Sequence, residues 1–399
     1  MRLDLGDLGF DEGAHLLVKR ASRQLSLGEE MHVTGNAPEL FTHLRVWCRS
    51  EGSAFRLESG RGGDASAAII RSAAESDRWA GAESCGGARG SEPAAVVEQP
   101  PRTWGLAARG ATVEVGAPEY GFTLVDKTEV WSAQAPRFYA QGAAAQWDPQ
   151  TAIPWDAPCD VPDDVEDAIV QIMTYLIENE TAALMVPSRF IAQLHPHFRE
   201  VMQVLALQAA DEARHIEIFT RRALLKRDKL GLSTSGGQAS LKTLIEEPDY
   251  AVASFLLSVL GEGTFLNLLR FIEMHASDPI TAAVARFAAQ DEARHVAFGL
   301  AHIGEHLERN PAARSRLAAG VRRRSDALRH TAGLNAEVFD ALIILAAGSW
   351  EHAAIRRGFQ RVMQLTRDMD EGRQKRLARL GFDQREAMEL SGLHTRNFM

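Results

Sequence analysis

The pentapeptide DEARH occurs twice in this chain, first at residues 211–215 and again in a later segment. Both copies lie in segments with the apolar spacing of a helix. On a helix, residues three apart project from the same face, so Glu212 and His215 point the same way, as do Glu292 and His295. A carboxylate and an imidazole on one face can bind one metal ion. Two such motifs therefore predict two neighbouring helices that hold two metal ions.

Each metal ion would still lack carboxylate ligands, and two further glutamates can supply them. In an antiparallel helical hairpin, residues at the same height are equally far from the turn. The midpoint between Glu180 and Glu212 falls on the proline of LHPH, and the midpoint between Glu262 and Glu292 falls within HASDP. Both midpoints are turn signals. Each DEARH motif is therefore preceded by one glutamate on the neighbouring helix, Glu180 for the first motif and Glu262 for the second.

Glu178 is the competing candidate on the first of these helices. Glu180 continues an apolar stripe, however, whereas Glu178 continues a more polar line. A carboxylate within an apolar stripe is costly unless it is paired or bound to a metal. We therefore expect Glu180 and Glu262 to be ligands, and we also assign them catalytic roles. The full predicted ligand set is Glu180, Glu212, His215, Glu262, Glu292 and His295.

The chemistry of this donor set indicates which metal it binds. Four carboxylates and two imidazoles suit iron or manganese better than structural zinc, which is the alternative metal. Two iron ions are the expected cofactor, with an Mn/Fe pair as a variant. Asp211 and Asp291 could each accept the free N–H of a ligand histidine. Arg214 and Arg294 could then neutralise these aspartates; simple surface ion pairing is the alternative for all four.

Two glycines, Gly261 and Gly263, flank the predicted ligand Glu262. A glycine inside a helix costs about 1 kcal/mol relative to alanine. Two of them beside a ligand suggest space for a substrate or for O₂, or a local π-type distortion of the helix. Close packing of helices is the alternative explanation.

With this pattern the sequence resembles the ferritin-like di-iron carboxylate superfamily over about residues 161–310. Its longer members with organic substrates, such as ribonucleotide-reductase-like oxidases and di-iron N-oxygenases, look more similar than the iron-storage proteins. The resemblance implies a four-helix bundle that activates O₂ to oxidise a small organic substrate. An external electron donor is expected, because the sequence carries no flavin or nicotinamide fingerprint.

Three other functions stay open at this point. A ferroxidase or iron-storage protein would use the same bundle, but storage subunits are short. A peroxide-reducing protein of rubrerythrin type usually brings a Cys-x-x-Cys module, which this sequence lacks. A helical scaffold stabilised by metal would coordinate its ions without access for solvent.

Residues 1–75 read as a separate α/β domain with the order strand–helix–strand–helix–strand. The stretches LDLGDLGF and PELFTHLRVWCRSEG resemble the TusA-like sulfur-carrier fold. Phe10 stands where that family carries its persulfide cysteine, so sulfur transfer by this residue is not expected. Cys48 lies inside a predicted helix, where we expect a small buried hydrophobe. A docking or regulatory role follows for this domain.

Composition marks the remaining boundaries. Residues 76–118 are rich in Gly, Ala, Pro and Ser, which predicts a linker. Residues 119–399 form the predicted helical domain, in which 119–160 are a segment strapped over the bundle. The sequence GLSTSGGQAS reads as a break between helices, and further helices are expected near 336–367 and 383–392. The predicted fold class is mainly α: a ferritin-like bundle with extra C-terminal helices, preceded by the small α/β domain.

Charge and cysteine content exclude several function classes. The net charge of −9 gives no electrostatic support for binding nucleic acid or an anionic membrane. The three cysteines have no spacing typical of a disulfide framework or a metal knuckle. The N-terminus lacks the apolar region of a signal peptide, and no apolar run approaches the ~20 residues of a membrane span. A cytoplasmic protein is expected, and a homodimer is compatible with the sequence.

Overall fold

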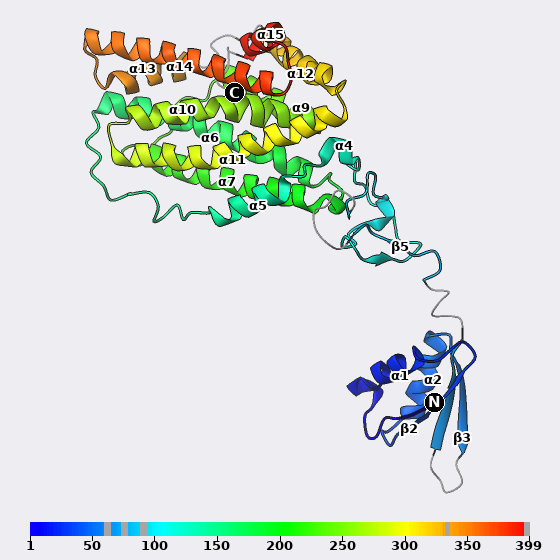
Figure 1. The fold of residues 1–399 in the computed structure, drawn as a ribbon. Helices are drawn as coiled ribbons and strands as arrows, with labels where there is room; N and C mark the ends of the chain where they lie inside the picture. Colours follow the sequence, from blue (N-terminus) through cyan, green and yellow to red (C-terminus); the bar gives the residue numbers. More distant parts are fainter. Residues whose placement is uncertain (60–64, 73–78, 88–94, 330, 332–335, 395–399) are drawn as a thin grey trace. The chain divides into compact units, whose positions relative to one another are not determined.

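The computed structural model describes residues 1–399 except 60–64, 73–78, 88–94, 330, 332–335 and 395–399 (Figure 1). The chain divides into two compact units. The first comprises Met1–Ser84 with Thr112–Ala117, and the second comprises Cys85–Ala111 with Pro118–Met399. Each unit has its own hydrophobic core.

The first unit is a four-stranded sheet with two helices. Its elements are β1 (Arg2–Asp4), α1 (Ala14–Ser22), β2 (Glu30–Thr34), α2 (Leu40–Ser50), β3 (Ala54–Ser59) and β4 (Ala65–Ile70). The strand order is β1-β2-β4-β3, with β1 parallel to β2 and the other pairs antiparallel. The five expected elements are present. The sequence analysis missed β4, because ASAAII is rich in alanine and shows no alternation of bulky and polar residues.

Cys48 lies in the core of this unit with no exposed surface. Burial raises the pKa of its thiol to about 12, so the thiolate is strongly disfavoured. The expectation that Cys48 acts as a small buried hydrophobe is confirmed.

The predicted linker over 76–118 contains ordered structure in its described part. Strands β5 (Glu83–Ser84) and β6 (Thr112–Val113) pair antiparallel, and a 3-10 turn, η3, covers Arg102–Trp104. In the helical unit, the backbone N–H of Val97 donates to Nε2 of His197 at 2.9 Å. Several described glycines of this segment have a positive φ, as in tight turns: Gly81, Gly86, Gly105, Gly110 and Gly116.

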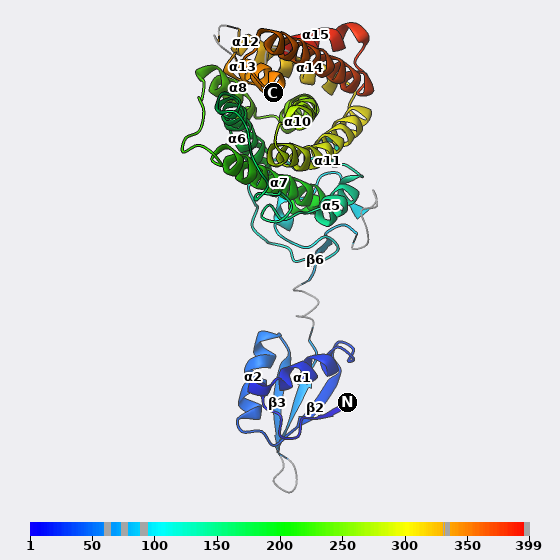
Figure 2. The ribbon, with the colours of Figure 1, turned by 90° about the vertical axis from the view of Figure 1, so that its left-hand side faces the viewer.

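Four long helical segments form the bundle of the second unit (Figure 2). They are α6 (Asp163–Ile191), α7 (Arg199–Ala223), the continuous segment α9–η5–α10 (Tyr250–Ser254, Phe255–Glu262 and Gly263–His275) and α11 (Pro279–Arg309). The first hairpin turns through the 3-10 helix η4 (Pro196–Phe198), and the second turns between His275 and Pro279. Both turns lie where the mirrored glutamates predicted them. The predicted fold class, mainly α with this bundle, is confirmed.

Further helices surround the bundle. They are α4 (Lys127–Val130), α5 (Ala135–Ala144), α8 (Ser235–Ile245), α12 (Ala313–Ala327), α13 (Ala336–Ala347), α14 (His352–Arg379) and α15 (Gln384–His394). Helix α5 lies along α7 and α11, within the segment expected to strap over the bundle. We call α12–α15 the C-terminal layer; it packs on α6, α9, η5 and α10 (Figure 1).

Two predictions about these helices need correction. The break expected at GLSTSGGQAS is present over residues 231–234, but its second half begins α8. The side chain of Thr234 accepts a hydrogen bond from the backbone N–H of Gly237 at 3.0 Å and caps this helix. The single helix expected near 336–367 is two, α13 and α14. Gly348 separates them with a φ of 69°, a left-handed conformation that ends a helix.

One helical stretch, Tyr250–His275, is long and apolar enough to cross a membrane, contrary to the expectation that no such run exists. Its mean hydropathy is 1.6, but 83% of its most apolar window is buried within the bundle. This is the burial expected of a core helix, which is apolar on all sides.

Candidate metal centre

The structure brings all six predicted ligand residues together in the middle of the bundle. Glu180 comes from α6, Glu212 and His215 from α7, Glu262 from the end of η5, and Glu292 and His295 from α11. None of the six is more than 5% exposed. Their shared burial follows from the two hairpins, which place these positions at one height along four inward-facing stripes.

The six residues form two overlapping groups. Ligand atoms of Glu180, Glu212, His215 and Glu292 lie within 4.8 Å of one another, and so do those of Glu212, Glu262, Glu292 and His295. Glu212 and Glu292 belong to both groups. Each group thus has one histidine and one glutamate of its own, and the two groups share two carboxylates. This arrangement suits two metal ions with Glu212 and Glu292 between them.

Each imidazole turns one nitrogen toward the carboxylates. Nδ1 of His215 lies 3.2 Å from Oε2 of Glu212, and Nδ1 of His295 lies 3.1 Å from Oε1 of the same residue. The contact from His295 does not have hydrogen-bond geometry, and its Nδ1 is buried without a hydrogen-bond partner. Both Nδ1 atoms are therefore placed to act as metal ligands.

The opposite nitrogens make hydrogen bonds that cross between the two motifs. Nε2 of His215 donates to Oδ2 of Asp291 at 3.2 Å, and Nε2 of His295 donates to Oδ2 of Asp211 at 3.2 Å. A proton held on Nε2 leaves the lone pair of Nδ1 free for a metal ion. Asp211 and Asp291 are at most 1% exposed, so the alternative of surface ion pairing does not apply to them.

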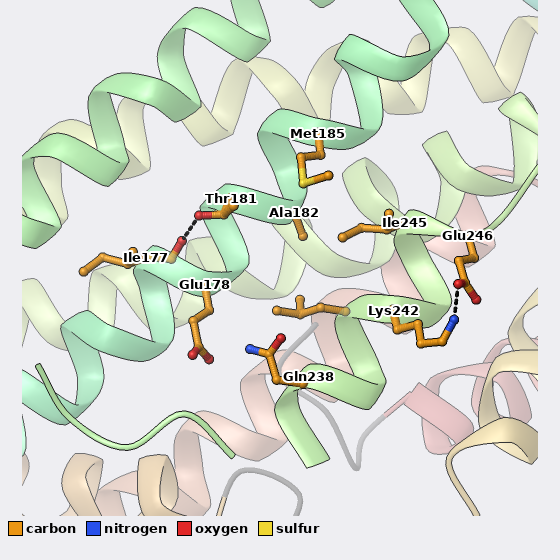
Figure 3. A pocket seen from close by; sticks show the side chains of 10 residues that line it. Ile177, Glu178, Thr181, Ala182, Met185, Gln238, Lys242, Ile245 and Glu246 are labelled. Atoms are coloured by element: carbon orange, nitrogen blue, oxygen red, sulfur yellow. Dashed lines mark hydrogen bonds and ion pairs between the residues drawn. The ribbon is translucent and has the colours of Figure 1, made fainter. Parts of the chain in front are cut away.

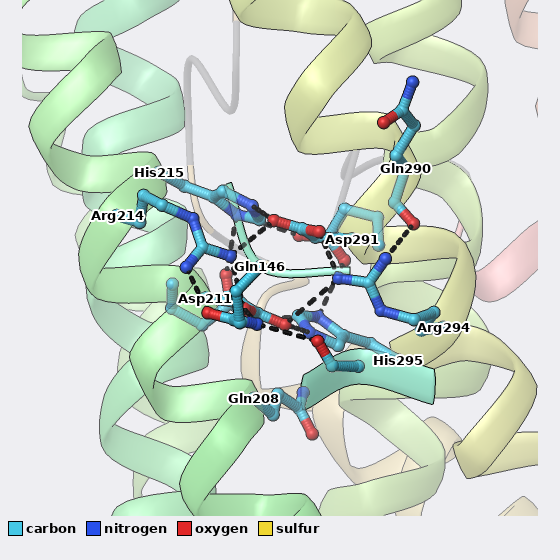
Figure 4. Close-up of polar contacts among 12 residues, drawn as sticks. Gln146, Gln208, Asp211, Arg214, His215, Gln290, Asp291, Arg294 and His295 are labelled. Atoms are coloured by element: carbon cyan, nitrogen blue, oxygen red, sulfur yellow. Dashed lines mark hydrogen bonds and ion pairs between the residues drawn. The ribbon is translucent and has the colours of Figure 1, made fainter. Parts of the chain in front are cut away.

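Arginine and strap residues surround the two aspartates (Figure 4). Arg214 Nη2 lies 2.5 Å from Oδ1 of Asp211 and 2.9 Å from Oδ2 of Asp291, so it bridges both. Arg294 likewise pairs with Asp291 and lies 3.5 Å from Asp211. Trp147 donates from its indole Nε1 to Asp291 at 2.9 Å. Both arginines therefore hold the two aspartates in place, and Trp147 also holds Asp291.

Gln146 also contacts this group of aspartates and arginines. Its side-chain Nε2 donates to Oδ1 of Asp211 at 2.9 Å, and its Oε1 accepts from Nη1 of Arg214 at 2.6 Å. The guanidinium of Arg214 also lies over the ring of Trp147, with Cζ 4.6 Å from the ring centroid. The segment just after α5 thus closes the outer side of the centre.

The carboxylates have more acceptor capacity than the protein satisfies. Five buried oxygens have no hydrogen-bond partner: Oε1 of Glu180, Oε1 of Glu212, Oε2 of Glu262 and both side-chain oxygens of Glu292. Burying such atoms without partners is costly. Two divalent ions would bind these oxygens and balance the clustered negative charge, so the residues fit a binuclear site of the iron or manganese type.

Without metal ions, bound protons offset the clustered negative charge of the carboxylates. Burial, and then the charge of Glu212, raises the pKa of Glu180 to about 8. Burial, and then the charge of Glu292, raises the pKa of Glu262 well above its ordinary value. Burial works against the charged form of His215, but the hydrogen bond to Asp291 and the nearby glutamates raise its pKa well above the usual range. Protons therefore occupy the site when metal ions do not.

Glu178 lies elsewhere. It lines a surface pocket between α6 and α8, together with Thr181, Met185 and Lys242 (Figure 3). Glu180 belongs to the buried cluster, as the apolar stripe predicted. The two glutamates are only two residues apart, and the helix directs them to different surroundings.

The helix that carries Glu262 is distorted in the way that its glycines suggested. Residues Phe255–Glu262 form a π-helix that ends on the predicted ligand Glu262. Such distortions are frequent at functional sites. The second glycine, Gly263, has a packing role: a Cβ there would overlap the guanidinium of Arg376 on α14. The π-type distortion and the close-packing alternative thus both apply, at neighbouring positions.

Gln208 joins Glu262 to a narrow pocket. Its Nε2 donates to Oε1 of Glu262 at 2.7 Å. The pocket that Gln208 lines is mostly apolar, and in this conformation it has room for about one water molecule. Its lining residues are Val186, Pro187, Phe190, Leu205, Gln208, Tyr250, Ser254, Leu257, Ser258 and Phe298. The hydroxyl of Tyr250 is buried there without a hydrogen-bond partner.

The sequence analysis did not identify Gln146, Trp147 and Gln208. Gln208 lies four residues before Glu212, on the same helix face, so helical spacing could have found it. Gln146 and Trp147 follow a helix about 65 residues before the first motif. Nothing in their local sequence separates them from the other aromatic and polar residues of the strap.

Comparison with known proteins gives only distant similarity. No protein-family model matches this sequence, and no curated protein is similar enough to count as a relative. Among solved structures, the R2-like ligand-binding oxidase from Sulfolobus acidocaldarius is similar at 17% identity, over 60% of this chain and 90% of that chain, with a TM-score of 0.41. An aldehyde deformylating oxidase from Synechococcus is similar at 17% identity over 57% and 96% of the two chains, with a TM-score of 0.40.

A third similar structure is an R2-like ligand-binding oxidase with an aerobically reconstituted Mn/Fe cofactor. It is 16% identical over 66% of this chain and 94% of that chain, with a TM-score of 0.43. These TM-scores all lie below 0.5. What the centre of this protein can bind therefore follows from its own side chains.

Proposed function

We propose that this protein is a non-haem di-iron oxidase or oxygenase that uses O₂ to oxidise a small organic substrate. One observation carries the proposal: two buried ligand groups share Glu212 and Glu292, and each adds its own glutamate and histidine. Iron, or iron with manganese, would supply the one-electron chemistry that O₂ reduction requires. Glu180 belongs to one group only, and Glu262 only to the other. We therefore assign the catalytic roles to these two carboxylates.

The surrounding side chains orient the six clustered residues, and their burial keeps water away from the centre. The crossed hydrogen bonds from Asp291 and Asp211 fix the orientation of His215 and His295. Gln208 holds one oxygen of Glu262 and leaves Oε2 unpartnered. The small pocket that Gln208 lines is one hydrogen bond away from Glu262. Any molecule larger than water requires its lining side chains to move.

The same chemistry implies a small organic substrate, O₂ and an external electron donor as partners. The proposed location is the cytoplasm. The ferroxidase and peroxide-reducing functions are the competing possibilities.

The test is to load the protein with Fe(II) without oxygen, count the iron, and then measure O₂ uptake with and without candidate substrates. We expect two iron ions per chain and O₂ uptake that increases with an organic substrate. Oxidation of many iron ions per chain would indicate a ferroxidase, and faster reaction with peroxide than with O₂ would indicate a peroxide-reducing protein.

A further inference from the structure

A second, larger pocket lies between α10 and α14, which run side by side in the helical unit (Figure 1). Its volume is about 530 Å³. Pockets that bind small organic molecules usually measure about 300–1,000 Å³. The pocket is therefore large enough for such a ligand, and it shares no residue with the metal centre.

Apolar side chains form the base and one wall of this pocket. Phe271 on α10 and Leu365 on α14 both line it and are only 7% and 4% exposed. Met274 lines it as well and is 76% exposed. The rings of Phe271 and His275 lie edge to face, with their centroids 4.5 Å apart. These side chains offer an aromatic and adaptable surface to the apolar part of a ligand.

The charged groups of the pocket are two arginines and one aspartate. Arg270 comes from α10, and Arg361 and Asp368 come from α14. Among the residues that the structure describes, none of the three forms an ion pair. Burial, and then the charge of Arg361, lowers the pKa of His275, so its imidazole is neutral at neutral pH. The pocket therefore carries a net positive charge.

Arg361 is the better oriented of the two arginines. Its Nη1 donates to the backbone carbonyl of Ala346, near the end of α13, at 2.7 Å. Its other N–H groups find no acceptor in the described part of the chain, and neither does any N–H of the Arg270 guanidinium. Asp368 follows Arg361 by seven residues, which is about 10 Å along a helix. An anionic group can therefore bind Arg361 without facing the aspartate.

The size of the pocket indicates a small molecule rather than a protein. Nine residues line it, whereas a stable protein interface uses roughly 20–30 residues on each side.

We propose that this pocket binds a small organic anion with an aromatic body, such as an aryl carboxylate. The carboxylate accepts charge-assisted hydrogen bonds from the guanidinium of Arg361. The aromatic body packs on Phe271, Met274 and Leu365, from which it displaces water. The site does not depend on the proposed oxidase activity.

The test compares naphthoate with its uncharged amide, naphthamide, which has nearly the same shape. Calorimetry with the full chain measures the affinity for each compound. We expect one saturable site for naphthoate per chain, and binding of naphthamide that is weaker by about tenfold or more, because the amide cannot form charge-assisted hydrogen bonds. Equal affinities for the two compounds, or no saturable binding of naphthoate, would overturn the proposal.

Two variants separate the charge of the site from its apolar surface. Arg361→Gln should weaken naphthoate binding by about tenfold or more and leave naphthamide binding nearly unchanged. Met274→Ala removes apolar contact, so it should weaken the binding of both compounds by the same factor. Both residues are exposed, so the core should fold normally in each variant.

Arg357→Gln is the matched control. Arg357 lies one turn before Arg361 on α14, is exposed and does not line the pocket, so its variant should bind naphthoate like the unchanged protein. Equal losses in Arg357→Gln and Arg361→Gln would contradict the assignment of the anion to Arg361. Sedimentation tests whether a second copy of the chain covers the pocket instead: a dimer that Met274→Ala dissociates would show an interface between copies and refute the small-molecule site.

Discussion

Asp291 accepts a hydrogen bond from Nε2 of His215 at 3.2 Å, although the two residues belong to different DEARH motifs. Asp211 and His295 repeat the relationship in the opposite direction, also at 3.2 Å. Each motif therefore orients the histidine of the other. The two motifs are therefore coupled: a substitution of the aspartate in one motif affects the histidine of the other.

The first prediction follows from this crossing. Asp291→Asn should weaken metal binding at the His215 side of the centre by about 10–100-fold, because the imidazole loses the anionic acceptor that fixes its proton on Nε2. A competition titration with Mn(II) measures the affinity. Asp167→Asn, at an exposed residue that pairs with Arg227 on the bundle surface, is the control and should bind metal normally. Equal affinities for the two variants would show that the crossed hydrogen bond does not support the ligand.

The second prediction concerns the ligand histidines. His215→Ala or His295→Ala should abolish O₂-dependent turnover while most of the helical content remains, since the bundle core consists mainly of apolar residues. Circular dichroism and metal analysis on the same samples separate loss of metal from loss of fold. If either variant kept two metal ions and unchanged turnover, that histidine would not be a ligand.

The third prediction is a pH dependence of the metal-free protein. The pKa of Glu180 is raised to about 8 in the folded state, against 4.5 without the fold. Between these pH values the folded chain holds a proton that the unfolded chain has lost, so the free energy of unfolding falls as the pH rises. The raised pKa values of His215 and His295 act in the same direction at higher pH.

Metal ions displace these protons, so they should stabilise the protein more at pH 8 than at pH 6. The measurement is the increase in Tm that anaerobic Mn(II) produces at each pH. Glu180→Gln removes one of the displaced protons and should reduce the difference between the two pH values. An increase in Tm that is the same at pH 6 and pH 8 would contradict this account of the site.

The fourth prediction concerns the first unit, which contributes none of the six clustered residues. From the sequence, a chain starting near Ser91 is expected to keep its metal ions and its reaction with O₂. That start would remove Cys85, whose Sγ lies 3.8 Å from Nδ1 of His197 in the helical unit. A chain starting at Trp79 keeps this contact and the pairing of β5 with β6, so it is the better truncation.

The Trp79 chain should bind the same number of metal ions as the full protein and react with O₂ at a similar rate. The role of the first unit would then lie in docking or regulation rather than in persulfide chemistry, for which Phe10 offers no thiol. Iron analysis and O₂ uptake test this. A truncated chain that folds but binds no iron would make the first unit part of the active site.

The sequence predicted that these six residues lie together because its signals are local and repeated. Spacing within a helix paired Glu212 with His215, and the mirror symmetry of two hairpins located Glu180 and Glu262. Trp147 was not predicted, because its contact with Asp291 joins residues 144 positions apart. Only the tertiary packing of the strap on the bundle determines that contact.

Weak local signals account for the errors in the fold. Strand β4 is central in its sheet, but its alanine-rich sequence has low strand propensity, so no strand is predicted there. Helix α8 has two glycines in its first turn, and the cap from Thr234 outweighs their cost. In both cases packing against neighbouring elements determines a structure that local propensity does not favour.

The most direct test of the binuclear centre is the metal content of two neighbouring variants, Glu180→Gln and Glu178→Gln. Both remove one carboxylate charge from α6, but only Glu180 lies in the cluster, whereas Glu178 lines the surface pocket. After anaerobic loading, we predict two metal ions per chain in the unchanged protein and in Glu178→Gln, and at most one tightly bound ion in Glu180→Gln. Two ions in Glu180→Gln together with a loss in Glu178→Gln would contradict the assignment of the centre.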